Sequence, residues 1–252
     1  MSTPGQSPEV IRYPDPGALT QDVAGRLLNL LAEVQAAGRT PSLALTGGTI
    51  AVDLYRAVRQ SPRCQDVDWS NVDVWWGDER FVPAGDPERN SGQAREALLD
   101  HLPLDPARVH EMASSDGEYG DDVDAAAAGY AEQLRTGARL EEGEPLFDAL
   151  LLGIGEDGHC ASLMPGTPEL HDERPVVPVR NSPKPPPTRI SLTMGPLMRG
   201  RQLWWIASGR SKAEPVRAAL SGAPVDEVPA AGPKGLDRTL WFLDEDAASA
   251  LR

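Results

Sequence analysis

Cysteine, basic residues and long apolar runs are all scarce in this chain of 252 residues. Its two cysteines, Cys64 and Cys160, provide neither a disulfide framework nor the spacing of a zinc site. No apolar run approaches the roughly 18 residues of a membrane-spanning helix, and residues 1–9 lack the basic start and apolar core of a secretory signal. These absences predict a cytoplasmic protein without a disulfide, a bound metal ion or a membrane span.

Acidic residues outnumber basic ones, with 38 Asp and Glu against 24 Lys and Arg, and the net charge is -14. A surface of this charge repels nucleic acid and anionic lipid, so we expect neither as a partner. The sequence carries no signal of oligomeric state, and we take a monomer as the default. It would repel an anionic metabolite as well. A phosphate-bearing ligand would therefore need a local cluster of cations and backbone N–H groups.

Short apolar runs alternate with helical patterns along the chain. Strands are predicted at residues 42–46, 72–76, 147–152, 202–207 and 239–243, and helices at residues 16–37, 49–59, 90–100, 123–134 and 211–220. This alternation is typical of right-handed βαβ units and predicts an α/β fold, with a Rossmann-like, mainly parallel sheet flanked by helices on both faces. We expect residues 1–252 to form a single domain, with residues 1–9 flexible.

The strand predicted at residues 147–152 runs directly into a glycine-rich turn that presents Asp157 and His159. Residues just beyond a buried parallel strand lie in the crevice where open α/β sheets bind ligands, and a histidine there can exchange a proton near neutral pH. We therefore predict a catalytic role for His159. Asp157 would fix the imidazole tautomer, contact substrate hydroxyls or close the turn through its own backbone.

The glycines of this turn also match the dinucleotide fingerprint G-x-G-x-x-G at Gly153, Gly155 and Gly158. That fingerprint needs a long helix directly after it, whereas Pro165 and Gly166 end any helix soon after the turn. We therefore expect no nucleotide cofactor. Gly155 and Gly158 would instead let the backbone approach a substrate closely, with the turn N–H groups of residues 155–158 available to an oxyanion.

A second strand-to-helix turn comprises Thr46, Gly47, Gly48 and Thr49. Backbone N–H groups at the start of a helix form a cradle for an anion, and two hydroxyls add further donors. A plain tight turn fits the sequence equally well. The turn lacks the Gly-Lys-Ser/Thr ending of a P-loop, so nucleotide binding is not indicated.

Further polar residues follow other predicted strands. Arg80 suits a phosphate through its fixed fork of donors. Asp78 and Glu79 would orient Arg80 or, as we favour, form structural ion pairs, and Asp78 is also a candidate for contact with the substrate. Asn90 and Ser91 are expected to cap a helix.

Lys212 lies in the first turn of a predicted helix, where the helix dipole disfavours a cation unless that cation binds an anion. Lys212 is therefore a candidate for binding phosphate, and the alternative is a lysine exposed to solvent. Arg189 is a weaker phosphate candidate, since an exposed arginine on an edge strand fits at least as well. Ser211 is in the position of an α/β-hydrolase nucleophile, but no histidine follows His171, so Ser211 is excluded.

Taken together, these stretches resemble the glucosamine-6-phosphate isomerase/6-phosphogluconolactonase family. The matching residues are 45–49, 76–83, 90–99, 153–166, 189–193 and 207–212, in the expected order. The deaminase branch of the family shares the histidine turn but continues as Ile-Ala-Phe-Asn-Glu-Pro, whereas residues 160–165 here follow the lactonase pattern. Thr46, where serine is common, and Met164, where phenylalanine is common, depart from that pattern without removing a catalytic group.

The resemblance implies hydrolysis of 6-phospho-D-glucono-1,5-lactone to 6-phospho-D-gluconate, the second step of the oxidative pentose phosphate pathway, without a cofactor. A lactone is an activated ester, so a water molecule and a general base suffice. His159 would be the base, and Arg80, Lys212 and the turn at residues 46–49 would hold the phosphate. The alternatives are an amino-sugar-phosphate isomerase/deaminase of the same family and a sugar-phosphate-binding regulator, for which the chain has no helix-turn-helix or basic patch.

Overall fold

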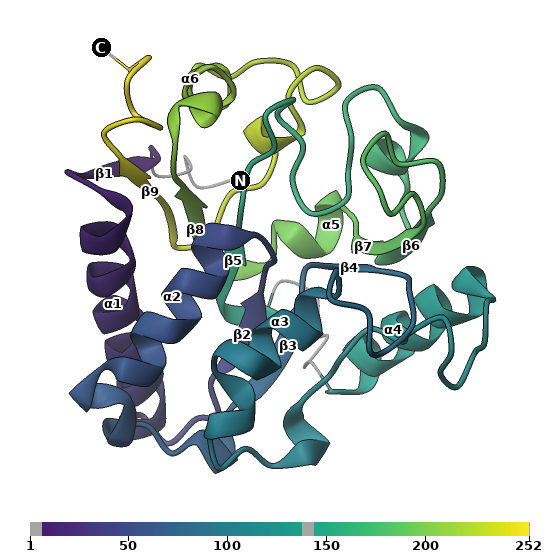
Figure 1. Cartoon of the computed structure of the whole chain (residues 1–252), viewed down its shortest axis with the longest axis horizontal. Coiled ribbons are helices and arrows are strands. Elements are labelled where there is room, and N and C mark those ends of the chain that lie inside the picture. The colour runs from purple at the N-terminus through teal and green to yellow at the C-terminus, as the bar shows by residue number, and fades with distance from the viewer. Residues whose placement is uncertain (1–6, 138–143, 252) are drawn as a thin grey trace.

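The computed structural model describes residues 7–137 and 144–251, and its centre is a six-stranded parallel sheet (Figure 1). The strand order is β1-β9-β8-β5-β2-β3. The bounds are β1 (Glu9–Tyr13), β2 (Ser42–Leu45), β3 (Asp73–Trp76), β5 (Phe147–Leu152), β8 (Gly200–Ala207) and β9 (Arg238–Asp244). All pairings within this sheet are parallel, which confirms the predicted fold class.

The order of the strands reverses between β2 and β5. From β2 the chain continues outward to β3, whereas from β5 it continues in the opposite direction to β8 and β9. Ligands of open α/β sheets bind at such a reversal, beyond the carboxyl ends of the strands. The loops after β2 and β5 are the turn at residues 46–49 and the turn that carries His159.

Helices cover one face of the main sheet, and helices together with a small second sheet cover the other. One apolar core includes residues of α1 (Pro16–Ala36), α2 (Thr49–Gln60) and α3 (Asn90–Ala97). The opposite core includes residues of α4 (Val123–Gly137), α5 (Met194–Leu197) and α6 (Ala213–Leu220). Short 3-10 turns occur at Pro62–Asp66, Trp69–Asn71, Leu99–His101, Pro106–Arg108, Pro168–His171, Arg210–Lys212 and Pro229–Ala231.

Paired tryptophans connect the sheet to both cores. Successive side chains of a strand point to opposite faces, so Trp75 packs in the α4 core and Trp76 in the α2 core. Trp204 and Trp205 divide in the same way, and Trp205 stacks on Trp241 with ring centroids 4.7 Å apart. These tryptophans form the core of the fold and do not line the pocket described below.

The second sheet was not predicted from the sequence. It is antiparallel with the order β4-β7-β6, formed by β4 (Asp78–Arg80), β7 (Arg189–Leu192) and β6 (Val176–Val179). Gly77 joins it to the main sheet, because its N–H donates to the Leu45 carbonyl and its own carbonyl accepts from Leu192. Since β7 is the central strand and Arg189 is buried, the alternative interpretation of Arg189 as an exposed arginine on an edge strand is wrong.

The helix starts agree with the sequence in α1 but not in α3. Asp15 caps α1 by accepting from the backbone N–H of Ala18, as predicted. In α3 the backbone N–H groups of Asn90 and Ser91 instead donate to Glu79, over 2.7 and 2.8 Å. The predicted capping by Asn90 and Ser91 is therefore wrong, because a buried carboxylate from β4 replaces it.

The first strand begins within the stretch 1–9 that we expected to be flexible. Residues 1–6 lie outside the described residues, whereas Glu9 belongs to β1, where it pairs with Leu240. Within residues 7–137 and 144–251, no helix is long and apolar enough to cross a membrane.

Candidate active site

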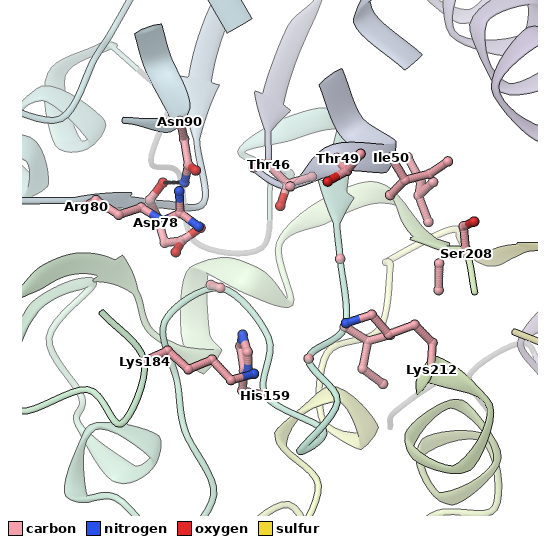
Figure 2. Close-up of a pocket in the computed structure, with 18 of the residues that line it drawn as sticks. Thr46, Thr49, Ile50, Asp78, Arg80, Asn90, His159, Lys184, Ser208 and Lys212 are labelled. Atoms are coloured by element: carbon pink, nitrogen blue, oxygen red, sulfur yellow. Dashed lines mark hydrogen bonds between the residues drawn. The ribbon is translucent and has the colours of Figure 1, made fainter. Parts of the chain in front are cut away.

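A cavity of about 630 Å³ opens beyond the carboxyl ends of β2, β5 and β8 (Figure 2). Most of the predicted site residues line it: Thr46, Gly47, Gly48, Thr49, Asp78, Arg80, Gly155, His159, Arg189 and Lys212. Asp157 and Gly158 do not. Figure 2 shows Asp78, Arg80 and Asn90 on one side of the cavity and Lys212 and Ser208 on the opposite side, with His159 and Lys184 facing the turn that carries Thr46 and Thr49.

The histidine turn orients its imidazole through Asp157. One carboxylate oxygen of Asp157 lies 2.5 Å from His159 Nδ1 and also accepts from the backbone N–H of His159 at 3.3 Å. Burial opposes ionisation of this carboxyl, but the hydrogen bonds and charge of His159 outweigh it, so the pKa of Asp157 falls below its ordinary value. An ionised Asp157 holds the proton on Nδ1. Nε2 is then the ring nitrogen that can accept a proton.

The glycines of this turn leave space for the His159–Asp157 pair and form hydrogen bonds within the turn. A Cβ on Gly155 would lie 2.0 Å from His159 Nδ1, so only glycine leaves room for the pair. Gly158 has a φ of +84° and packs against Val228. The N–H of Gly155 donates to the His159 carbonyl, and that of Gly158 to the Gly155 carbonyl. The turn itself therefore uses two of the N–H groups that we expected to be available to an oxyanion, those of Gly155 and Gly158.

The turn at residues 46–49 is held from within α2. The Tyr55 hydroxyl donates to the Thr46 carbonyl at 2.6 Å and accepts from the Thr46 N–H at 3.1 Å. Gly48, at a φ of +100°, leads directly into α2, which has no side-chain cap. The first N–H groups of a helix have no partner within it. This end of α2 therefore faces the cavity as a potential anion site.

Cations from separate segments of the chain line the cavity. Arg80 donates from one terminal nitrogen to the Glu88 carbonyl at 2.6 Å, while its Nε is buried and has no hydrogen-bond partner in the described part of the chain. Lys212 directly precedes α6 rather than lying in its first turn. Burial lowers the pKa of Lys212 below its ordinary value. A bound anion would stabilise the charged form of Lys212, which burial disfavours.

Arg189 lines the cavity but is largely engaged in holding a loop. Only 4% of the residue is exposed. Its guanidinium donates to the carbonyls of Lys184 at 3.0 Å and Pro186 at 3.1 Å. Arg189 thereby fixes the proline-rich loop that carries Lys184 into the cavity.

Lys184 is a cavity residue that the sequence did not reveal. Its Nζ lies 3.5 Å from the Asp157 carboxylate oxygen that contacts His159. In the sequence Lys184 is one lysine among prolines. Only the packing of the loop beside the histidine turn places its charge at the site.

The neighbouring carboxylates Asp78 and Glu79 have different environments. Glu79 is fully buried, lies 3.6 Å from Arg89 in an ion pair and has its pKa raised by burial, so the predicted structural role holds for it. Asp78 lines the cavity and accepts from the Ser162 hydroxyl at 2.7 Å. Within the described residues, neither carboxylate forms an ion pair with Arg80.

Asn90 also belongs to the site, although the sequence indicated only a helix cap. It lines the cavity and donates from Nδ2 to the Asp78 carbonyl at 3.0 Å. Among residues 7–137 and 144–251, no three His, Cys, Asp or Glu side chains are grouped as metal ligands.

Comparison with known proteins identifies the family of this chain. The sequence model of the Glucosamine-6-phosphate isomerases/6-phosphogluconolactonase family matches residues 14–241, and the chain belongs to that family. A 6-phosphogluconolactonase of Streptomyces coelicolor is 49% identical and aligns over 97% of this chain and 95% of its own. One from Mycobacterium tuberculosis is 45% identical over 95% of this chain and 96% of its own.

Solved structures agree with the fold. The 6-phosphogluconolactonase of Trypanosoma brucei superimposes with a TM-score of 0.81 at 25% identity, covering 98% of this chain and 99% of that chain. A monomeric glucosamine-6-phosphate deaminase gives a TM-score of 0.78 at 20% identity, over 96% and 99% of the two chains. Both branches of the family therefore share this architecture.

Proposed function

We propose that the protein hydrolyses 6-phospho-D-glucono-1,5-lactone to 6-phospho-D-gluconate, the second step of the oxidative pentose phosphate pathway. The observation that carries this proposal is the His159–Asp157 pair at the edge of a cavity lined by cations. The lactonase names of relatives at 45–49% identity support it. A base and an anion site are what the hydrolysis of a phosphorylated lactone requires.

In the proposed mechanism His159 Nε2 accepts a proton from water as the water oxygen attacks C1 of the lactone. The carbonyl becomes a tetrahedral oxyanion. When the bond between C1 and the ring oxygen breaks, the imidazolium returns the proton to that oxygen, leaving a free acid and a hydroxyl. The ionised Asp157 stabilises the imidazolium between the two steps, and no cofactor is needed because a lactone is already activated.

The phosphate would bind between the start of α2 and Lys212, with Arg80 as a further cation. Helix N–H groups and a half-buried ammonium together offset the repulsion from a chain of net charge -14. Since the N–H groups of Gly155 and Gly158 are used within the turn, we assign the stabilisation of the oxyanion to the positive charge of Lys184.

A coupled assay with freshly prepared lactone tests this function. We expect acid production above the spontaneous rate and no ammonia release from glucosamine 6-phosphate. Ammonia release without lactone hydrolysis would instead identify the isomerase/deaminase alternative, and a lack of both would contradict the proposal.

We further propose that the protein acts as a monomer in the cytoplasm, without a nucleic-acid partner. The acidic net charge supports the last point. In the described part of the chain, the exposed large apolar residues are limited to Val10, Met198 and Leu236. These residues come from β1, from the end of α5 and from the segment before β9, which does not suggest an extensive apolar interface.

A further inference from the structure

One buried oxygen in the active-site cavity has no role in the fold. Asn90 is only 2% exposed and lines the cavity. Its Nδ2 donates to the Asp78 carbonyl, whereas its Oδ1 is buried and has no hydrogen-bond partner within the described residues. Buried polar atoms in proteins are nearly always paired, and an acceptor left unpaired destabilises the fold. An unpaired acceptor at a cavity wall therefore points to a ligand.

The orientation of this amide is fixed by its surroundings. The backbone N–H of Asn90 is held by Glu79 at 2.7 Å, and exchanging the amide oxygen and nitrogen would set two acceptors, Oδ1 and the Asp78 carbonyl, against each other. The nitrogen therefore faces Asp78 and the oxygen faces away from it. Figure 2 shows this side chain on the Asp78 side of the cavity.

The absence of a side chain at Gly47 leaves space for the same oxygen. A Cβ at Gly47 would lie 1.9 Å from Asn90 Oδ1 and 2.5 Å from Asn90 Cγ. No other residue fits there while Asn90 keeps its position. The glycine of the turn at residues 46–49 thus gives room to the amide, which places Oδ1 between that turn and Asp78.

Asn90 Oδ1 can only accept hydrogen bonds, so its partner in the ligand must be a donor. A carbonyl oxygen accepts hydrogen bonds and repels anions, so Oδ1 is unsuited to the phosphate or to the carboxylate of the product. The groups of a sugar phosphate that can donate to it are the ring hydroxyls.

We propose that Asn90 is a specificity-determining residue whose Oδ1 accepts a hydrogen bond from one ring hydroxyl of the substrate. The proposal rests on the lactonase function proposed above. A site built to bind a hydroxyl discriminates strongly against an analogue that lacks it, because its own polar atom is then left unpaired.

The test compares wild type and Asn90→Leu on the phosphorylated lactone and on its deoxy analogues, each lacking one ring hydroxyl. We expect the leucine variant to lose roughly 10-fold or more in kcat/KM on the full substrate. With the one deoxy analogue that lacks the partner hydroxyl, wild type and variant should react equally. A loss of the same factor on every lactone would show a purely structural role and overturn the proposal, as would an unchanged kcat/KM.

Asn29 provides a matched control. Its Oδ1 is also buried without a partner among the described residues, but it lies in α1 and does not line the cavity. Asn29→Leu should leave kcat/KM unchanged on all substrates. A thermal melt checks that each variant folds. If Asn90→Leu does not fold, Asn90→Ser is compared with wild type on the same lactones, and a uniform loss or an unchanged kcat/KM again overturns the proposal.

Wild-type hydrolysis of the full lactone is measured first, so that the two proposals fail separately. Absence of enzymatic hydrolysis by wild type would contradict the proposed function. Normal wild-type hydrolysis with a uniform loss in Asn90→Leu would contradict only the role of Asn90.

Discussion

At the scale of single residues, the site depends on how charges are placed around one imidazole. Asp157 holds Nδ1, Lys184 approaches the same carboxylate oxygen and Lys212 lies across the cavity. Each of these groups has a distinct expected effect on kinetics, because in the proposed mechanism Asp157 acts on the base, Lys184 on the reacting carbonyl and Lys212 on the phosphate.

Changing Asp157 to Asn should lower kcat by on the order of 100-fold with little change in KM. An amide can leave the imidazole in the wrong tautomer and does not stabilise the imidazolium. Steady-state kinetics on the lactone checks this expectation. A variant with wild-type kcat would show that Asp157 only closes the turn.

Changing Lys212 to Met should raise KM for the phosphorylated lactone far more than for unphosphorylated gluconolactone. The exposed Lys234, changed to Met, is the matched control and should alter neither value. Equal effects of Lys212→Met on both substrates would contradict phosphate binding by this residue.

The lowered pKa of Lys212 adds a pH dependence. The Lys212 ammonium loses its proton at a lower pH than an exposed lysine does, because burial disfavours its charged form. Binding of 6-phosphogluconate should therefore weaken in alkaline solution in wild type but not in Lys212→Met, as measured by calorimetry. The same alkaline weakening in both proteins would assign it to another group.

At the scale of elements, the strand ends were predictable and the second sheet was not. Apolar runs that stop at glycine marked β2, β3, β5 and β8 in the sequence, and the structure confirms all four. By contrast, β4 is only three residues long and wholly polar, and β6 contains Pro178, which argues against a strand. Both strands form because the neighbouring β7 pairs with them. The local sequence pattern does not predict this pairing.

The same limit explains the site residues that the sequence missed. His159, Lys212 and the turn at residues 46–49 follow strands directly, so the parallel topology alone brings them together. Lys184 and Asn90 reach the cavity because other side chains hold their backbone: Arg189 holds the loop of Lys184, and Glu79 holds the backbone of Asn90. Hydrophobic periodicity carries no information about such contacts.

Glu79 links β4 to α3, and its removal should destabilise the protein. Changing Glu79 to Ala leaves Arg89 buried without its ion-pair partner and the first N–H groups of α3 without acceptors. We expect a loss of about 3–5 kcal/mol in the free energy of unfolding, measured with denaturant.

The control for this change is Glu132→Ala. Glu132 forms an exposed ion pair with Arg135 within one helix, and such pairs contribute less than about 1 kcal/mol. Similar losses in the two variants would contradict the structural role of Glu79.

At the scale of the whole molecule, the protein has an acidic net charge, but several basic side chains line its cavity. The net charge of the chain is -14, whereas Arg80, Lys184, Arg189 and Lys212 line one cavity where the strand order reverses. The fold class could be predicted because the alternation of strands and helices runs through the entire chain. The interpretation of the chain as a single domain stays a prediction.

The central claim is that His159 transfers the proton in lactone hydrolysis, and the rate of His159→Asn on fresh lactone tests it most directly. We expect hydrolysis above the spontaneous background to fall by at least about 100-fold, in the range typical of a lost general base, while 6-phosphogluconate still binds. Turnover close to that of wild type would contradict the account and remove His159 as the base.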